Sequence, residues 1–176
     1  MNSPAMRSHV ILPSPIGPLT LVAEAGQLIA VYLDSQRHRP AEGSLGAPGN
    51  PGAAPFAAAA SQLAAYFAGR RTGFDLPLAP AGTDFQQRVW AALQTIPYGQ
   101  TWSYAQLADK IGRPSAVRAV GLANGKNPIA VIIPCHRVIG SDGSLTGYGG
   151  GLDRKRFLLD LESRGVTRPG QVRPGG

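Results

Sequence analysis

The sequence predicts a fold of the α/β class in its α+β form, with a small sheet domain first and a helical domain second. Short β-rich runs around turn residues fill the first 35 positions, whereas later apolar residues recur at helical spacing. A helix, a glycine turn and a second helix follow one another over 103–124, which is the order of a helix-turn-helix. We expect a sheet domain over 1–79, a helical domain over 80–165 and a disordered tail over 166–176.

The first half is expected to open with strands and to close with one helix. Strand-forming residues over 19–23 and 28–33 flank Gly26, and this pattern predicts a β-hairpin. The stretch 56–67 is rich in alanine and ends before Gly69, as a helix does. The other expected segments are a strand over 9–12, a mobile loop rich in Gly, Pro and Ala over 37–55, and a short strand with a linker over 70–82.

Residues that cap helices mark the start of each helix in the second half. A glycine-rich loop over 147–151 then precedes the final helix, 152–162. The expected caps and helices are Thr83 or Asp84 before a helix to about Thr95, Ser103 before 104–111, and Ser115 before a helix through Asn124.

Positive charge is the main compositional feature of these 176 residues. Lys and Arg number 17 against 10 Asp and Glu, and residues 80–165 carry ten of the cations against six acids. The excess suits a polyanion such as nucleic acid, although a proteome that prefers arginine would leave the same mark. No signal peptide and no membrane-spanning stretch is evident, and the single cysteine suits a reducing cytoplasm.

The only cysteine, Cys135, lies at the end of an apolar run, 129–133, and directly before His136 and Arg137. A packing cysteine usually has apolar neighbours on both sides, so this position favours a nucleophile over a packing role. Nearby positive charge would favour the reactive thiolate. In extended chain adjacent side chains point to opposite sides, so we expect a bound water to link the thiol to His136.

An ordered string of motifs around this cysteine resembles the O6-alkylguanine-DNA alkyltransferase family. The resemblance extends from Phe85 to the last helix and is looser over 14–19. It implies a ribonuclease-H-like sheet in the first domain, and a second domain that carries the helix-turn-helix and the active site. The motifs are Arg118-Ala119-Val120-Gly121, Asn127-Pro128, Pro134-Cys135-His136-Arg137-Val138 and Thr146-Gly147-Tyr148-Gly149-Gly150-Gly151.

The resemblance implies DNA repair by direct reversal, in which the protein is consumed. An alkyl group passes from O6 of guanine, or less readily from O4-methylthymine, to Cys135 in one irreversible SN2 step without a cofactor. His136 would act as the base through water, oriented by Glu162. Tyr104 would protonate the leaving purine, and Asn127 would brace the site. The alternatives are an exposed His136, an exposed Glu162 on its helix and an ordinary aromatic role for Tyr104.

The family also implies a duplex partner whose target base is flipped out through the minor groove, with Arg118 entering the vacated space. The alternative for Arg118 is a solvated helix residue. The loop reads Tyr148-Gly149, where some relatives have serine second. The implied DNA contacts are Arg118, Ser103, Ser115, Ala119, Gly121 and Asn124, and the implied base pocket is Tyr148, Gly149, Gly150, Val138 and Lys155.

Two other functions fit parts of the sequence. A lesion binder without chemistry would share the DNA-binding features, and a cysteine hydrolase would share the nucleophile but needs an oxyanion hole. We expect no metal, because one cysteine cannot form the N-terminal zinc site of some relatives. We also expect no membrane and no obligate protein partner, and the 37–55 loop is a candidate for contacts between neighbouring molecules on DNA.

Overall fold

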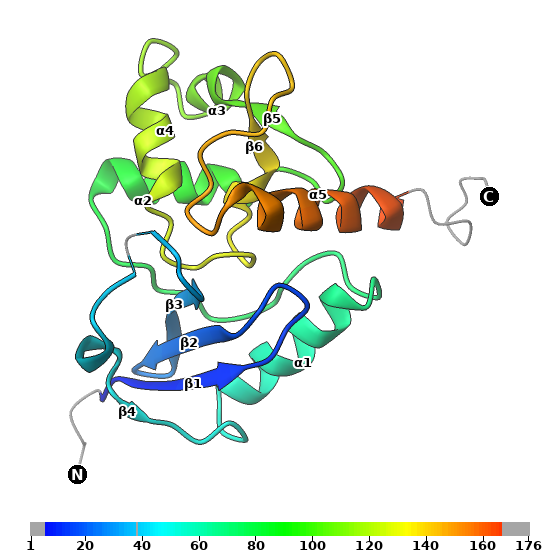
Figure 1. The fold of residues 1–176 in the computed structure, drawn as a ribbon. Coiled ribbons are helices and arrows are strands. Elements are labelled where there is room, and N and C mark those ends of the chain that lie inside the picture. Colours follow the sequence, from blue (N-terminus) through cyan, green and yellow to red (C-terminus); the bar gives the residue numbers. More distant parts are fainter. Residues whose placement is uncertain (1–5, 38, 167–176) are drawn as a thin grey trace. The chain divides into compact units, whose positions relative to one another are not determined.

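The computed structural model describes residues 6–37 and 39–166 and has the predicted α+β composition (Figure 1). It divides into two compact units. The first unit runs to Ala81 and also contains Pro128–Ile132; the second contains Gly82–Asn127 and the chain from Ile133 on. Apart from Val166, the expected tail lies outside the described residues.

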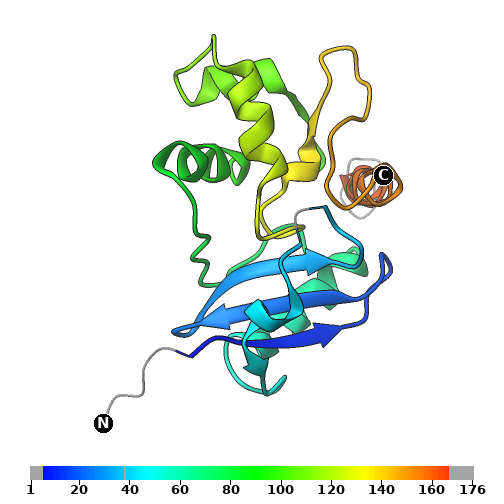
Figure 2. The same ribbon diagram turned by 60° about the vertical axis from the view of Figure 1, so that its left-hand side comes forward.

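A four-stranded sheet forms the centre of the first unit, and the predicted hairpin is confirmed (Figure 2). The hairpin turns at Ala25 and Gly26, whose φ angles of 54° and 78° are both positive, as a tight two-residue turn requires. The strand order is β3-β2-β1-β4, with β1, β2 and β3 antiparallel and β4 parallel to β1. The strands are β1 (Ser8–Leu12), β2 (Leu19–Glu24), β3 (Gln27–Leu33) and β4 (Ala47–Pro48).

The prediction of a mobile loop over 37–55 is wrong for its middle part. A short 3-10 helix, η1 (Glu42–Leu45), precedes β4, and Leu45 is buried against β2 and β3. The Ala47 N–H donates to the Arg7 carbonyl at 3.1 Å, and the Gly49 N–H donates to the His9 carbonyl at 2.7 Å. These bonds join residues about 40 positions apart, which a composition rich in Gly and Pro does not reveal.

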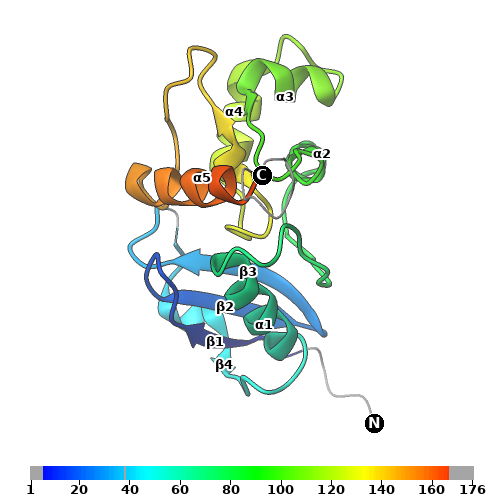
Figure 3. The same cartoon turned by 90° about the vertical axis from the view of Figure 1, so that its right-hand side faces the viewer.

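The predicted helix over 56–67 is confirmed as α1 (Phe56–Phe67), which lies along one face of the sheet (Figure 3). Its Phe56, Leu63 and Tyr66 side chains are buried. The strand expected within 70–82 is only a single bridge between Leu28 and Leu78.

The apolar run before Cys135 belongs to the first unit as far as Ile132. Val31 on β3 donates its N–H to the Pro128 carbonyl at 2.9 Å, and its carbonyl accepts from the Ala130 N–H at 3.2 Å. The run therefore pairs with β3 only at Ile129 and then turns away, and this return to the sheet domain was not predicted from the sequence.

The second unit is helical and carries the predicted helix-turn-helix in α3 and α4. Thr83, one of the two predicted caps of α2, and Ser103, the predicted cap of α3, form capping boxes with Gln86 and Gln106 respectively. The elements are α2 (Asp84–Leu93), β5 (Trp102–Ser103), α3 (Tyr104–Lys110), α4 (Val117–Gly125), η2 (Cys135–Arg137), β6 (Val138–Ile139) and α5 (Leu152–Val166).

Two helix boundaries differ from the prediction. Ser115 does not cap α4, because the chain turns again after Pro114 and the cap position falls on Ala116, which makes no side-chain bond. The last helix continues four residues beyond Glu162, to Val166. Among the described residues, no helix is both long and apolar enough to cross a bilayer.

Candidate active site

Cys135 begins the short 3-10 turn η2, and its side chain is buried. The Cys135 N–H donates to the Ile133 carbonyl at 2.8 Å, and the Arg137 N–H donates to the Pro134 carbonyl at 3.0 Å. The expectation of an extended chain at this point was wrong, because these bonds close a turn. The turn holds the side chains of Cys135, His136 and Arg137 in the protein interior.

His136 is fully buried, and its imidazole is oriented by Glu162 of α5. The Nε2 atom lies 2.8 Å from Glu162 Oε2, while Nδ1 is buried and has no protein partner among the described residues. Burial lowers the pKa of His136 and outweighs the opposing pull of Glu162. The ring is therefore neutral near pH 7, with its proton on Nε2 donated in the hydrogen bond to Glu162 and a lone pair on Nδ1. An exposed histidine and an exposed Glu162 are both excluded.

Glu162 is also bound by Arg137, which was not predicted as a site residue. Arg137 Nε donates to Oε1 at 2.8 Å, and Nη2 donates to Oε2 at 3.0 Å. Burial alone would raise the pKa of Glu162, but the bonds and charges of His136 and Arg137 hold it at about 2. Glu162 is therefore a carboxylate across the physiological range.

Two asparagines of the second unit hold the backbone around the thiol. Asn127 Nδ2 donates to the Ile133 carbonyl at 2.8 Å, and its side chain also hydrogen-bonds to the Cys135 thiol. Asn124 Nδ2 lies 3.5 Å from the Cys135 carbonyl, and its Oδ1 is buried without a partner in the described part of the chain. Asn124 is only 2% exposed, so its expected place among DNA-contacting residues is wrong.

The cation that acts on Cys135 is Lys155 of α5, not the neighbouring residues that the sequence suggested. Burial raises the pKa of the Cys135 thiol, while the Asn127 bond and the Lys155 charge lower it in part. His136 is neutral and Arg137 is paired with Glu162, so neither supplies the expected positive charge. The resting thiol is therefore protonated and needs a base.

Lys155 is itself buried and joins two segments near the thiol. Its Nζ donates to the Val138 carbonyl at 2.6 Å and to the Thr146 carbonyl at 2.6 Å. Burial lowers the pKa of Lys155 to about 8, against a smaller upward effect of Cys135. Lys155 thus fixes the start of the glycine-rich loop to β6 while keeping a charge close to Cys135.

The comparisons with known proteins agree over nearly the whole chain. The family model of the 6-O-methylguanine DNA methyltransferase, ribonuclease-like domain, matches residues 7–80, and that of the DNA binding domain matches 84–164. The methylated-DNA–protein-cysteine methyltransferase of Mycobacterium tuberculosis is 58% identical over 151 residues, which cover 86% of this chain and 89% of that protein. The chain belongs to the O6-methylguanine-DNA methyltransferase family.

Further members of the family show the same relation. The methylated-DNA–protein-cysteine methyltransferase of Methanosarcina barkeri is 52% identical over 157 residues, covering 89% of this chain and 97% of that protein. The crystal structure of Mycobacterium tuberculosis OGT in complex with DNA has a TM-score of 0.82 and 55% identity, covering 90% of this chain and 94% of that chain. The predicted family and fold are both confirmed.

One tyrosine from α3 and one from the glycine-rich loop lie close to these residues. Tyr104 OH donates to the Thr146 carbonyl at 3.3 Å, so α3 is tied to the same carbonyl that Lys155 binds. Tyr148 is buried, and its OH has no partner among the described residues. Burial, and to a lesser degree the nearby Cys135, raise the pKa of Tyr148 well above its ordinary value.

The outer face of α4 is exposed and combines a cation with apolar side chains. Arg118 and Ala119 are exposed, and the Leu122 side chain is 66% exposed although it is large and apolar. Gly121 lies on the inner side, where an added Cβ would stand 3.7 Å from the Tyr104 ring. Ser115 is exposed, whereas the Ser103 hydroxyl is occupied as the cap of α3.

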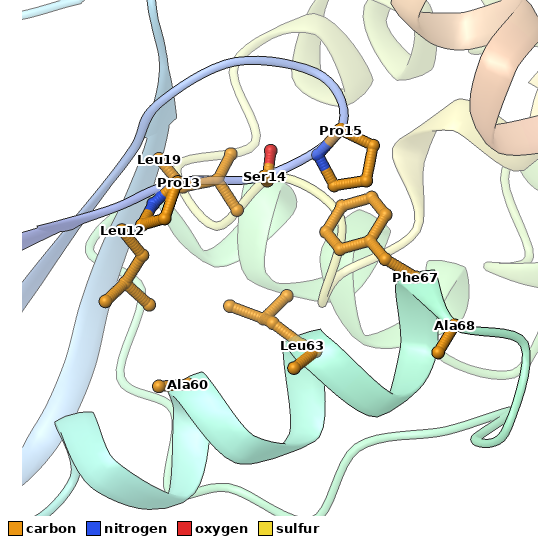
Figure 4. A pocket seen from close by; sticks show the side chains of 10 residues that line it. Leu12, Pro13, Ser14, Pro15, Leu19, Ala60, Leu63, Phe67 and Ala68 are labelled. Carbon is orange, nitrogen blue, oxygen red and sulfur yellow. The ribbon is translucent and has the colours of Figure 1, made fainter.

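The first unit contains an apolar pocket that does not belong to this site. The pocket has a volume of about 520 Å³ and lies between α1 and the loop that follows β1 (Figure 4). Its lining has no titratable side chain, so it offers no acid or base. The lining includes Leu12, Pro13, Leu19, Leu63 and Phe67.

Among the described residues, no group of three or more His, Cys, Asp or Glu side chains could hold a metal ion.

Proposed function

We propose that this chain repairs DNA by moving an alkyl group from O6 of guanine to Sγ of its own Cys135, irreversibly and once per molecule. O4-methylthymine would be a weaker substrate. One observation carries the proposal: the only thiol of the chain adjoins a buried neutral imidazole whose Nδ1 lone pair has no partner in the described part of the protein. Such an arrangement supplies a base for a thiol whose raised pKa requires one.

His136 would activate the thiol through one water. A water molecule between Cys135 Sγ and His136 Nδ1 would take the thiol proton and pass its own proton to the imidazole. The negative Glu162 then stabilises the imidazolium through Nε2, at the 2.8 Å distance already present. Lys155 stabilises the thiolate that forms.

Alkyl transfer would then be a single displacement. The thiolate attacks the alkyl carbon, a carbon–sulfur bond forms, and the bond between that carbon and O6 breaks. The guanine leaves as an anion and takes a proton from Tyr104, which a later solvent proton replaces. The thioether product has no activated bond, so no step regenerates Cys135 and the protein is spent.

The alkylated base would lie in a pocket formed by the glycine-rich loop and the turn after Cys135. The buried Tyr148, whose hydroxyl has no partner within residues 6–37 and 39–166, would pack against the base, and the backbone of Gly149 and Gly150 would contact it. Val138 and Lys155 would form the opposite side. Their shared bond from Lys155 Nζ to the Val138 carbonyl keeps this side rigid.

We propose double-stranded DNA as the partner, bound through its minor groove by α4. The exposed Arg118 and Leu122 suit this role, because minor-groove proteins commonly insert apolar side chains and cations where they distort the duplex. Arg118 would occupy the space of the flipped base, since its planar cation can stack and hydrogen-bond at once. Four further residues would lie near the sugar-phosphate backbone of the DNA: Ser103, Ser115, Ala119 and Gly121.

Replacing Arg118 with alanine should slow repair of duplex DNA about 10-fold or more, because filling the vacated stack offsets a few kcal/mol of unstacking. Reaction with free O6-alkylguanine base should change little, since no base pair is broken there. Single-turnover rates on both substrates measure the difference. Lys110→Ala, at an exposed lysine of α3, is the control for a general loss of charge. An equal loss of rate on both substrates would remove the flipping role of Arg118.

The predicted domain over 80–165 would then carry out the alkyl transfer and bind DNA. The predicted domain over 1–79 would support that domain. A cytoplasmic location, the lack of an obligate protein partner and contacts between molecules through 37–55 stay predictions. The lone reduced cysteine is the ground for the first of these.

Titration of the protein with duplex that contains O6-methylguanine tests the function. The amount of guanine restored should rise with the protein added and stop at one lesion per molecule. Continued repair beyond that ratio would indicate a turning-over enzyme. Tight binding without restored guanine would indicate a lesion binder.

A further inference from the structure

Arg137 is held from three sides within the second unit. Its Nε and Nη2 bind the two oxygens of Glu162, and its Nη1 donates to the Ile96 carbonyl at 2.6 Å. Its guanidinium carbon also lies 5.7 Å from the centre of the Tyr98 ring, within the range of a cation–π contact. The side chain is 8% exposed. A cation this well fixed neutralises Glu162 in one defined geometry.

A buried carboxylate without that cation would change the state of His136. An unpaired carboxylate in the interior is strongly disfavoured, and it lowers its energy by drawing a proton onto its neighbour. The neighbour is His136, whose Nε2 shares the Glu162 Oε2 atom with Arg137 Nη2. A histidine protonated in this way has no lone pair at Nδ1 and cannot act as a base.

We propose that Arg137 is a positioning residue that neutralises Glu162 and thereby keeps His136 uncharged and able to accept the thiol proton. The inference rests on the proposed function, because it assigns Arg137 a task in the same reaction. The guanidinium suits the task because it does not lose its proton in proteins. It binds Oε1 through Nε and shares Oε2 with the imidazole, so it fixes the orientation of the carboxylate toward His136.

The charged and titratable groups that face His136 each shift its pKa in a defined direction. Glu162 raises the pKa of the imidazole, whereas Arg137 on η2 and Lys155 on α5 lower it, and burial lowers it most. Cys135 precedes His136 on the same turn and is protonated at rest, and Tyr148 from the loop is neutral. Of the two cations, Arg137 is the one that touches Glu162. Its loss is therefore expected to strengthen the pull of Glu162 on the imidazole proton.

The rate of methyl transfer should consequently depend on pH in a way that Arg137 controls. The base works only when His136 is unprotonated, so transfer is lost as the pH falls through the pKa of His136. Arg137→Gln should raise that pKa and move the acid limb of the rate profile upward by about one pH unit or more. Arg137→Lys keeps a cation beside Glu162 and should move the limb by less than half as much.

The experiment measures single-turnover transfer against pH, together with the NMR titration of the His136 imidazole in the protein without DNA. The double variant Arg137→Gln with Glu162→Gln removes both charges, and it should show no upward shift even if the single variant folds poorly. The proposal would be overturned if the acid limb of Arg137→Gln coincided with that of the wild type. It would also be overturned if the upward shift persisted in the double variant.

The two readouts separate this inference from the proposed function. If the wild-type chain transfers no methyl group, the function is wrong, while the NMR titration still reports whether Arg137 sets the protonation of His136. A rate loss that is equal at every pH, with an unchanged titration, would reduce Arg137 to a structural role.

Discussion

Replacing Cys135 with serine should abolish methyl transfer while leaving binding to the lesion intact. A hydroxyl in this buried position stays protonated, and its oxygen is a far weaker nucleophile toward an alkyl carbon than a thiolate. We expect a loss on the order of 10⁶-fold, the scale seen when a catalytic nucleophile is removed. The rate of loss of O6-methylguanine from duplex DNA measures the effect.

The same variant also serves as a test of fold and binding. Asn124 and Asn127 bind the backbone and the thiol of Cys135, and serine keeps a small side chain that can form hydrogen bonds, so the change should cost little stability. The affinity for a lesion-containing duplex should stay within a few-fold of the wild type. Cys135→Ala should behave in the same way, and residual transfer in either variant would assign the nucleophile elsewhere.

Replacing Glu162 with glutamine should destabilise the protein by roughly 3–5 kcal/mol, the usual cost of leaving one partner of a buried ion pair uncompensated. Arg137 is 8% exposed at its side chain and would keep its charge without a counter-ion. Denaturant unfolding of both proteins at pH 7 measures the difference in free energy. The shared carboxylate also fixes His136, so transfer should slow as well.

An exposed ion pair provides the matched control. Arg7 and Glu24 lie 2.8 Å apart, but their side chains are 45% and 38% exposed. Glu24→Gln should therefore cost no more than about 1 kcal/mol, because water screens the pair. If Glu162→Gln costs no more than this control, the buried network does not stabilise the fold.

The stabilising effect of Glu162 should also depend on pH. Its pKa in the folded state is about 2, below the ordinary value of 4.5. A lowered carboxylate pKa gives stability that is fully present above the ordinary value and is lost as the pH falls through the folded one. The gap between wild type and Glu162→Gln should hold from pH 7 to about 5 and shrink from there toward pH 2.

Signals confined to a few neighbouring residues made much of the fold predictable. The hairpin around Gly26 and the capping boxes of Thr83 and Ser103 each depend on residues within a few positions. By contrast, β4 forms because backbone groups of Ala47 and Gly49 meet those of Arg7 and His9. Pairing over such a distance leaves no local pattern in the sequence.

In the candidate site, too, local motifs were predictable from the sequence and contacts between distant residues were not. The motif around Cys135 pointed to the nucleophile, to His136 and to Glu162, and the three lie together on η2 and α5. The tight turn at Cys135, and the burial of Asn124, depend on hydrogen bonds that propensity does not reveal. Arg137 was predicted only as a positive charge beside Cys135, and its ion pair with Glu162 was missed because the two residues lie 25 positions apart.

The mass of the intact protein after reaction with O6-methylguanine duplex tests the central claim most directly. The account predicts a gain equal to one methyl group replacing one hydrogen, found on the peptide that contains Cys135 and never exceeding one per molecule. An unchanged mass despite repaired or tightly bound DNA, or a methyl group on any other residue, would contradict it.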